Sequence, residues 1–104
     1  MISYERITRL FVKEEECIEI EFMVHMSDGD RRCWMGKLPK EHGKELFWFG
    51  LKEDGTQSYD FYCFRDFTAA PVFNGQSLRE CWEKIEILSI DGFDPQEILE
   101  LLQV

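Results

Sequence analysis

The feature that most constrains this chain is a ten-residue segment, residues 17–26 (CIEIEFMVHM), in which apolar and polar side chains alternate. One face carries Ile18, Ile20, Phe22, Val24 and Met26, and the other carries Glu19, Glu21 and His25. A period of two is that of a strand with one face in the core. The turn signal SDGD follows at 27–30, because Asp-Gly accepts positive φ, and RRCWMGK at 31–37 fits a returning strand. The sequence therefore predicts a β-hairpin.

A second hairpin is predicted from ELFWFGL at 45–51 and SYDFYCFRDF at 58–67, with KEDGTQ between them as the turn. Here the alternation fails, and both faces of each strand are apolar. Strands of this kind are normally covered on both faces. The surplus aromatic residues are Trp34, Phe47, Trp48, Phe49, Tyr59, Phe61, Tyr62 and Phe64. Either residues 1–16 and 68–76 cover a second face, or the surplus forms a partner surface.

Residues 4–12 fit two structures. We favour a strand that pairs with 17–26 through the KEEE turn at 13–16. The alternative is a short helix with Ile7, Leu10 and Phe11 on its apolar face.

Two helices are predicted near the end of the sequence. Ser77 and Glu80 form a capping box, and the apolar stripe that follows is Leu78, Cys81, Trp82 and Ile85. The second helix begins with Asp94 as the N-cap and Pro95 in the first helical position. Its apolar face is Ile98, Leu101 and Leu102. Residues 86–92, EILSIDG, fit a short strand between the two helices.

These elements predict one α+β domain over residues 1–104. We expect an antiparallel β-meander of about five strands, followed by two short helices packed on one face. A chain of 104 residues has the size of a single domain, and 44% hydrophobic residues are enough for one core.

The four cysteines predict neither a metal site nor a disulfide framework. No pair has C-x-x-C spacing, and nothing marks the chain for secretion, so we expect reduced thiols in the cytoplasm that are buried and inert. The two histidines, His25 and His42, are far apart in the sequence. A zinc site of Cys33, Cys63 and His25 is conceivable if their strands are neighbours, but no local spacing supports it. We therefore expect no metal.

No catalytic or cofactor-binding residues are predicted. There is no G-x-G-x-x-G loop, and Ser77 lacks the second glycine of a nucleophile elbow. Asp60 and Asp66 flank an aromatic strand and could face a cleft, yet isolated acids usually form a solvated face.

The net charge of −9 is concentrated in the second half of the chain. Residues 53–104 carry a net charge of −8, and residues 1–52 a net charge of −1. Such a field repels nucleic acids and membrane surfaces and attracts basic proteins. The longest apolar run, at 46–51, is too short to span a bilayer. We expect neither a nucleic-acid nor a membrane partner.

The function most consistent with these observations is a non-enzymatic protein-binding module that docks on a basic partner, such as an inhibitor or immunity-type protein. The predicted partner-binding residues are Trp48 and Tyr62 as anchors, with Asp91, Asp94, Glu97 and Glu100 for electrostatic steering. One alternative is a small ligand-binding domain or enzyme with an aromatic-lined pocket near Asp60, Asp66 or Cys63. Another is a structural homodimer that pairs sheet against sheet.

Overall fold

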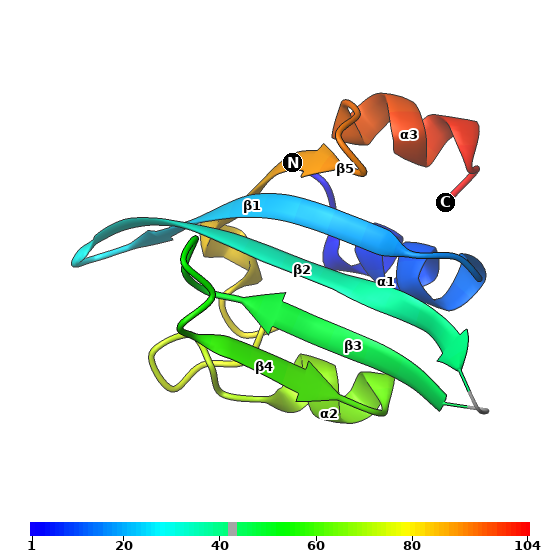
Figure 1. Cartoon of the computed structure of the whole chain (residues 1–104). Coiled ribbons are helices and arrows are strands. Elements are labelled where there is room, and N and C mark those ends of the chain that lie inside the picture. Colours follow the sequence, from blue (N-terminus) through cyan, green and yellow to red (C-terminus); the bar gives the residue numbers. More distant parts are fainter. Residues whose placement is uncertain (42–43) are drawn as a thin grey trace.

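The computed structural model describes residues 1–41 and 44–104, with the backbone alone at 40 and 41, so His42 lies outside the described residues. In chain order the elements are α1 (Tyr4–Lys13), β1 (Ile18–Met26), β2 (Gly29–Glu41), β3 (Lys44–Gly50), β4 (Ser58–Phe61), α2 (Phe64–Ala69), the 3-10 helix η1 (Trp82–Lys84), β5 (Ile85–Ile90) and α3 (Pro95–Leu101). The strands form one antiparallel sheet in the order β4-β3-β2-β1-β5 (Figure 1). The predicted α+β class and the antiparallel sheet of five strands are confirmed; β1 to β4 follow one another as a meander, and β5 pairs with β1.

The first hairpin follows the alternation in the sequence. β1 pairs with β2 from Ile18 opposite Lys37 to Met26 opposite Gly29, and Gly29 has a φ of 130°, which favours glycine. The buried side chains of β1 are Ile18, Ile20, Phe22 and Val24. The second predicted hairpin is present as β3 and β4.

The prediction of a strand over residues 4–12 is wrong, since this segment is the helix α1. Ser3 caps the helix, with its Oγ accepting a hydrogen bond from the Arg6 N–H at 3.2 Å. Ile7, Leu10 and Phe11 are the buried residues, as the helical alternative required. The i, i+3, i+4 stripe prevails because its three apolar side chains face the core together.

The predicted strand over residues 58–67 is only partly correct, because β4 ends at Phe61 and the chain then forms α2. The Sγ of Cys63 caps α2 by accepting a hydrogen bond from the Asp66 N–H at 3.3 Å. Phe67 is fully buried, and its ring stacks on that of Phe49 with centroids 4.3 Å apart. Turning into a helix at the sheet edge brings Phe67 into the core, which a continued strand would not do.

The capping box at Ser77 is confirmed, but the α-helix predicted after it is absent. Ser77 N–H donates to Glu80 Oε1 at 2.9 Å, and Glu80 N–H donates to Ser77 Oγ at 3.2 Å. The chain continues as turns and a single 3-10 turn, η1, before it enters β5. The predicted apolar residues Leu78, Cys81, Trp82 and Ile85 are all buried. Pairing of Ile85 with Val24 in β1 ends the helical segment early.

The helix α3 begins as predicted. Asp94 Oδ2 accepts a hydrogen bond from the Glu97 N–H at 3.1 Å, and Pro95 occupies the first turn. The predicted apolar face is wrong at Leu101, which is 76% exposed, whereas Leu99 is fully buried. The short helix places Leu99, rather than Leu101, against the rest of the core.

The helices α1 and α2 lie behind the sheet in Figure 1, and they cover the same face. The Phe11 ring of α1 lies 5.4 Å from that of Phe67 in α2, between centroids. Phe73, from the loop after α2, lies 5.3 Å from Phe49 on this same face. The interpretation that residues 1–16 and 68–76 cover a second face is therefore wrong. One core uses all of these segments, and none of the described helices lies over the opposite face of the sheet (Figure 1).

The end of α1 is held by a buried lysine. Lys37 in β2 is 2% exposed, and its Nζ donates hydrogen bonds to the carbonyl oxygens of Phe11, at 2.7 Å, and Glu14. Glu45 Oε2 lies 3.5 Å from the same nitrogen. The ammonium group thereby satisfies carbonyl groups that a helix end leaves without partners.

Candidate binding surface

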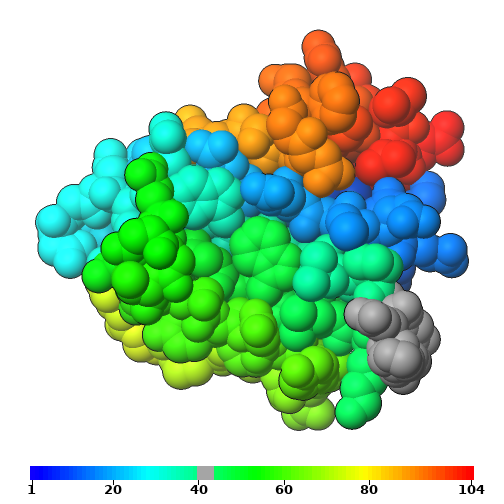
Figure 2. All heavy atoms as spheres, in the orientation of Figure 1, coloured from blue at the N-terminus to red at the C-terminus, as the bar shows by residue number. Residues whose placement is uncertain are grey.

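The uncovered side of the sheet, called the open face below, is formed by every second residue of its strands. Its described residues are Glu19, Glu21, Met23 and His25 of β1, Asp30, Arg32, Trp34, Gly36 and Leu38 of β2, Lys44, Leu46, Trp48 and Gly50 of β3, Ser58 and Asp60 of β4, and Glu86 and Ser89 of β5. Figure 2 looks onto this face, and the strands from β1 (blue) to β4 (green) form its centre. Leu38 and Leu46 lie opposite each other and add apolar area.

The strand register arranges these side chains in rows across the sheet. One row, called the Trp48 row, runs from Glu19 through Gly36 and Trp48 to Asp60. The next row, called the Trp34 row, contains Ser89, Glu21, Trp34, Gly50 and Ser58. Each tryptophan thus lies opposite a glycine of the neighbouring strand.

The indole of Trp48 lies against the backbone of Gly36. A Cβ atom at position 36 would stand 2.8 Å from Trp48 Cζ2 and would also collide with the carbonyl oxygen of Ile18. Only glycine leaves this space, which is a common reason for glycine inside a strand. The ring is half-buried, because one side rests on the sheet and no helix covers the other.

A groove with three carboxylates borders the Trp48 row on the side of β5. It is lined by Glu19, Glu21, Ser89, Asp91 and Gly92 and has a volume of about 470 Å³. Asp91 is fixed there, since its N–H donates to the Glu19 carbonyl at 2.7 Å and its Oδ1 accepts from the Glu19 N–H at 2.8 Å. The groove and the tryptophans therefore form one continuous surface.

The acids of the open face differ in whether they already have a cation beside them. Glu21 Oε1 lies 3.2 Å from Arg32 Nε, and Glu86 contacts His25. Within the described residues, the carboxylates of Glu19 and Asp60 form no ion pair. These two acids flank the Trp48 indole within its own row.

The structure brings some of the predicted partner-binding residues together. Trp48 lies on the open face, and Asp91 lies at the end of its row, beyond Glu19. Tyr62 follows β4 and is 70% exposed, with Lys44 Nζ 5.9 Å from its ring centroid.

The other predicted acids lie on or next to α3, beyond the β5 edge of the sheet. Asp94 is occupied as the N-cap of this helix. Glu97 and Glu100 are exposed and belong to the helix itself. Asp91 lines the groove beside the Trp48 row, whereas Asp94, Glu97 and Glu100 do not.

His25 links three strands at the far end of the open face. Its Nδ1 lies 2.9 Å from Asp30 Oδ1, and its Nε2 lies 3.1 Å from Glu86 Oε1. These hydrogen bonds, first that to Asp30 and then that to Glu86, raise the pKa of His25 above its ordinary value. The imidazolium is thus favoured, with both ring nitrogens donating.

Within the described residues, the cysteines and His25 do not come together as a catalytic or metal-binding group. Cys33 and Cys81 are buried, and burial raises the pKa of each thiol to about 11, which makes them inert. Cys33 is on the core face, whereas His25 is on the open face. Cys63 is exposed, contrary to the expectation that the thiols are buried, and so is Cys17. Among residues 1–41 and 44–104 there is no group of His, Cys, Asp and Glu that could hold a metal ion.

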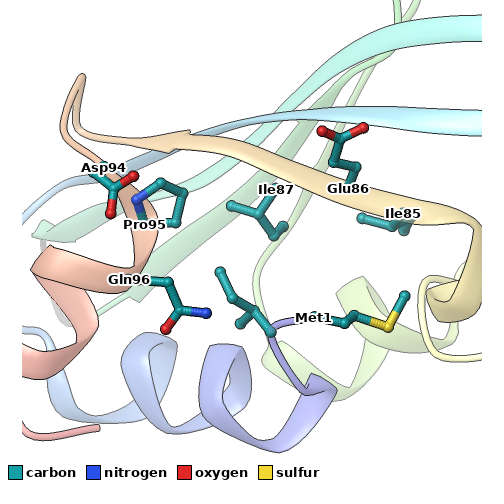
Figure 3. A pocket seen from close by; sticks show the side chains of 8 residues that line it. Met1, Ile85, Glu86, Ile87, Asp94, Pro95 and Gln96 are labelled. Atoms are coloured by element: carbon teal, nitrogen blue, oxygen red, sulfur yellow. The ribbon is translucent and has the colours of Figure 1, made fainter.

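A separate cavity of about 370 Å³ lies between β5, the start of the chain and α3 (Figure 3). Its walls are chiefly apolar, with Ile2, Ile85, Ile87 and Pro95 among them. The carboxylate of Glu86 points away from this cavity in Figure 3. This cavity is not the aromatic-lined pocket that was expected near Asp60, Asp66 or Cys63. Asp60 lies on the open face, whereas Cys63 and Asp66 lie at the start of α2.

Sequence reasoning did not assign Gly36, Glu19 and Glu21 to the site. It named Trp34 only among the surplus aromatic residues, and Asp60 only beside an expected pocket. The signal was present for most of them. The turn at SDGD sets Met26 opposite Gly29, and counting from there places Glu21 opposite Trp34 and Glu19 opposite Gly36. A second signal is that each of two tryptophans lies opposite a glycine in an apolar strand, Trp34 opposite Gly50 and Trp48 opposite Gly36.

Comparison of the chain with protein-family models, with curated proteins and with solved structures finds no match. In the described part of the chain, the helices are too short or too polar to cross a membrane.

Proposed function

We propose that this protein is a non-enzymatic protein-binding module that docks a basic partner protein on its open face, in the manner of an inhibitor or immunity-type protein. The observation that carries the proposal is an uncovered sheet face on which two half-buried tryptophans share their rows with the acids Glu19, Glu21 and Asp60. Large apolar patches on small proteins are usually interaction sites, and tryptophan is enriched at their energetic centres.

The charges of the open face support a basic partner. Its described acids are Glu19, Glu21, Asp30, Asp60 and Glu86, against Arg32 and Lys44 as its fixed cations. The acids of α3, Glu97 and Glu100, extend the negative field beyond the sheet edge. Such a field speeds association, while buried tryptophans slow dissociation. We place this function in the cytoplasm, where the four free cysteines would stay reduced.

The test compares two triple variants of equal charge as baits in native cytosol. The open-face variant is Glu19→Gln, Glu21→Gln and Asp60→Asn, and the control is Glu15→Gln, Glu53→Gln and Glu83→Gln, all exposed and outside the strands that form this face. We expect the wild type and the control to retain the same basic protein, released by high salt, and the open-face variant to lose it. Equal retention by all three would overturn the proposal.

The apolar cavity of Figure 3 supports a second candidate, a small-ligand-binding domain, because its volume lies within the range of ligand pockets. A ligand that binds only the folded protein raises its melting temperature. A thermal-shift screen with apolar metabolites, repeated on Ile87→Trp to fill the cavity, tests this candidate. A stabilising compound that fails with the variant supports it, and no shift with any compound counts against it.

A homodimer through the open face is a third candidate. It would hide the tryptophans but would bring two faces of the same negative charge together, which costs free energy. The mass in solution at low and high salt distinguishes this candidate, since such a dimer would strengthen as salt screens the repulsion.

A further inference from the structure

The Trp48 row has the geometry of a site for one cationic side chain. The indole of Trp48 packs against two glycines. Its Cζ2 atom lies over Gly36, and its Cζ3 atom lies 3.9 Å from the position that a Cβ atom of Gly50 would occupy. The ring therefore extends from β3 over β2 and lies along the sheet. Its outer side is a flat π-surface, which attracts cations.

Carboxylates stand on both sides of this surface. Asp60 is paired with Trp48 across β3 and β4, and Glu19 is paired with Gly36 across β1 and β2. Neighbouring strands are about 4.8 Å apart, and the ring reaches over β2, so each acid begins about one strand spacing from the indole. Neither acid has an ion-pair partner within the described residues.

A planar guanidinium group fits this arrangement better than an ammonium group. It can stack flat on an indole and still donate hydrogen bonds in its own plane to carboxylates at either side. An ammonium group carries its charge at a point and holds its hydration more strongly, so it gains less from the flat ring.

We propose that the Trp48 row is the recognition site for an arginine side chain of the basic partner, stacked on Trp48 between Glu19 and Asp60. The proposal rests on the proposed function, which needs only a basic partner, and it adds which residue of that partner is recognised and where.

The experiment titrates the protein with a short glycine peptide that carries arginine at alternate positions, and with its lysine and citrulline analogues. The readout is the NMR signal of each indole N–H. We expect the arginine peptide to shift the Trp48 signal and to bind about two- to fivefold more tightly than the lysine peptide, as cation–π stacking at an exposed site implies. The citrulline peptide, which is planar but neutral, should not bind.

Matched variants assign the site. Trp48→Leu and the pair Glu19→Gln with Asp60→Asn should each abolish the preference for arginine, whereas Glu53→Gln with Glu83→Gln should keep it. Circular dichroism of each variant checks that it folds. If the arginine and lysine peptides bind equally and Trp48→Leu changes nothing, the proposal of an arginine site is wrong. The proposed function would still be supported by a basic partner that is captured through the open face. If neither peptide binds and the wild-type bait retains no basic protein, both proposals fail.

Discussion

At the scale of single residues, the chain uses polar groups to join elements that are distant in the sequence. Lys37 connects β2 to the end of α1, and His25 connects β1 to the hairpin tip and to β5. Neither role is visible in the sequence, because both depend on which strands become neighbours. Because Lys37 ends the predicted strand at 31–37, the sequence alone would suggest an exposed side chain. Its burial follows from the position of α1.

Lys37→Met should destabilise the fold. The methionine side chain fills a similar volume but leaves the buried carbonyl groups of Phe11 and Glu14 without a donor, which costs about 1–3 kcal/mol. Urea unfolding measures the free energy, and Lys52→Met, on the exposed β3–β4 turn, is the control. A loss no larger than that of the control would show that the buried ammonium group contributes nothing.

His25 should make stability depend on pH. Its folded pKa is raised above the ordinary value of 6.5, so protonated His25 stabilises the native state below about pH 6.5, and this contribution is lost as the pH rises through the folded pKa. Thermal melts between about pH 5.5 and 8.5 should show this decline in the wild type and a weaker one in His25→Gln. An NMR titration in which the His25 ring has an ordinary pKa would refute the paired arrangement.

At the scale of elements, the sheet was predictable and the helices were predictable only in part. Alternation and Asp-Gly turns are local signals. Alternation located β1, and the Asp-Gly turns located the hairpins β1–β2 and β3–β4, although the end of β4 at Phe61 was not predicted. Residues 4–12 satisfy a strand and a helix equally well by their own pattern, and the decision comes from packing on Phe47 and Phe67. The capping box at Ser77 formed without its α-helix because pairing of Ile85 with β1 was the stronger constraint.

The glycines of the two tryptophan rows should differ sharply in their tolerance of a methyl group. Gly36→Ala places Cβ against the Ile18 carbonyl and the Trp48 ring, and we expect a loss of about 1–3 kcal/mol. Gly50→Ala is the matched control, since its Cβ would make ordinary contacts at 3.9 Å and should change stability by less than about 0.5 kcal/mol. Similar unfolding midpoints for the two variants would mean that the contact between the Trp48 ring and the backbone of Gly36 is not rigid.

At the scale of the whole molecule, α1 and α2 lie on one side of the sheet and the open face is the other side, with α3 beside the β5 edge (Figure 1). The sequence indicated a surplus of aromatic residues, but it could not tell which side would stay open. Which side stays open depends on α1 and the loop around Phe73 packing on the same face of the sheet. Of the predicted partner-binding residues, Trp48 lies centrally on the open face, Asp91 ends its row, and the acids of α3 lie beyond it.

Negative charge should be what keeps the open faces of two molecules apart. Near the sequence isoelectric point of about 4.6 the repulsion due to net charge vanishes, and we expect self-association that is absent at pH 7. Light scattering across this range should show it, and Leu46→Thr with Trp48→Thr should reduce it. Leu101→Thr, which removes an exposed leucine from α3, should leave it unchanged. Association that is equal in all variants would assign the contact to another surface.

The pairing of β5 with β1 has a consequence for how the chain is made. The strands β1 to β4 form from neighbouring segments, but β5 joins Ile90 to Ile20 and Ile85 to Val24, across most of the sequence. A growing chain on the ribosome therefore carries one side of β1 without its partner until residues 85–90 have emerged. Unpaired strand edges of this kind invite aggregation. In the completed protein, β5 covers this edge of β1, which stays unpaired for the longest time during synthesis.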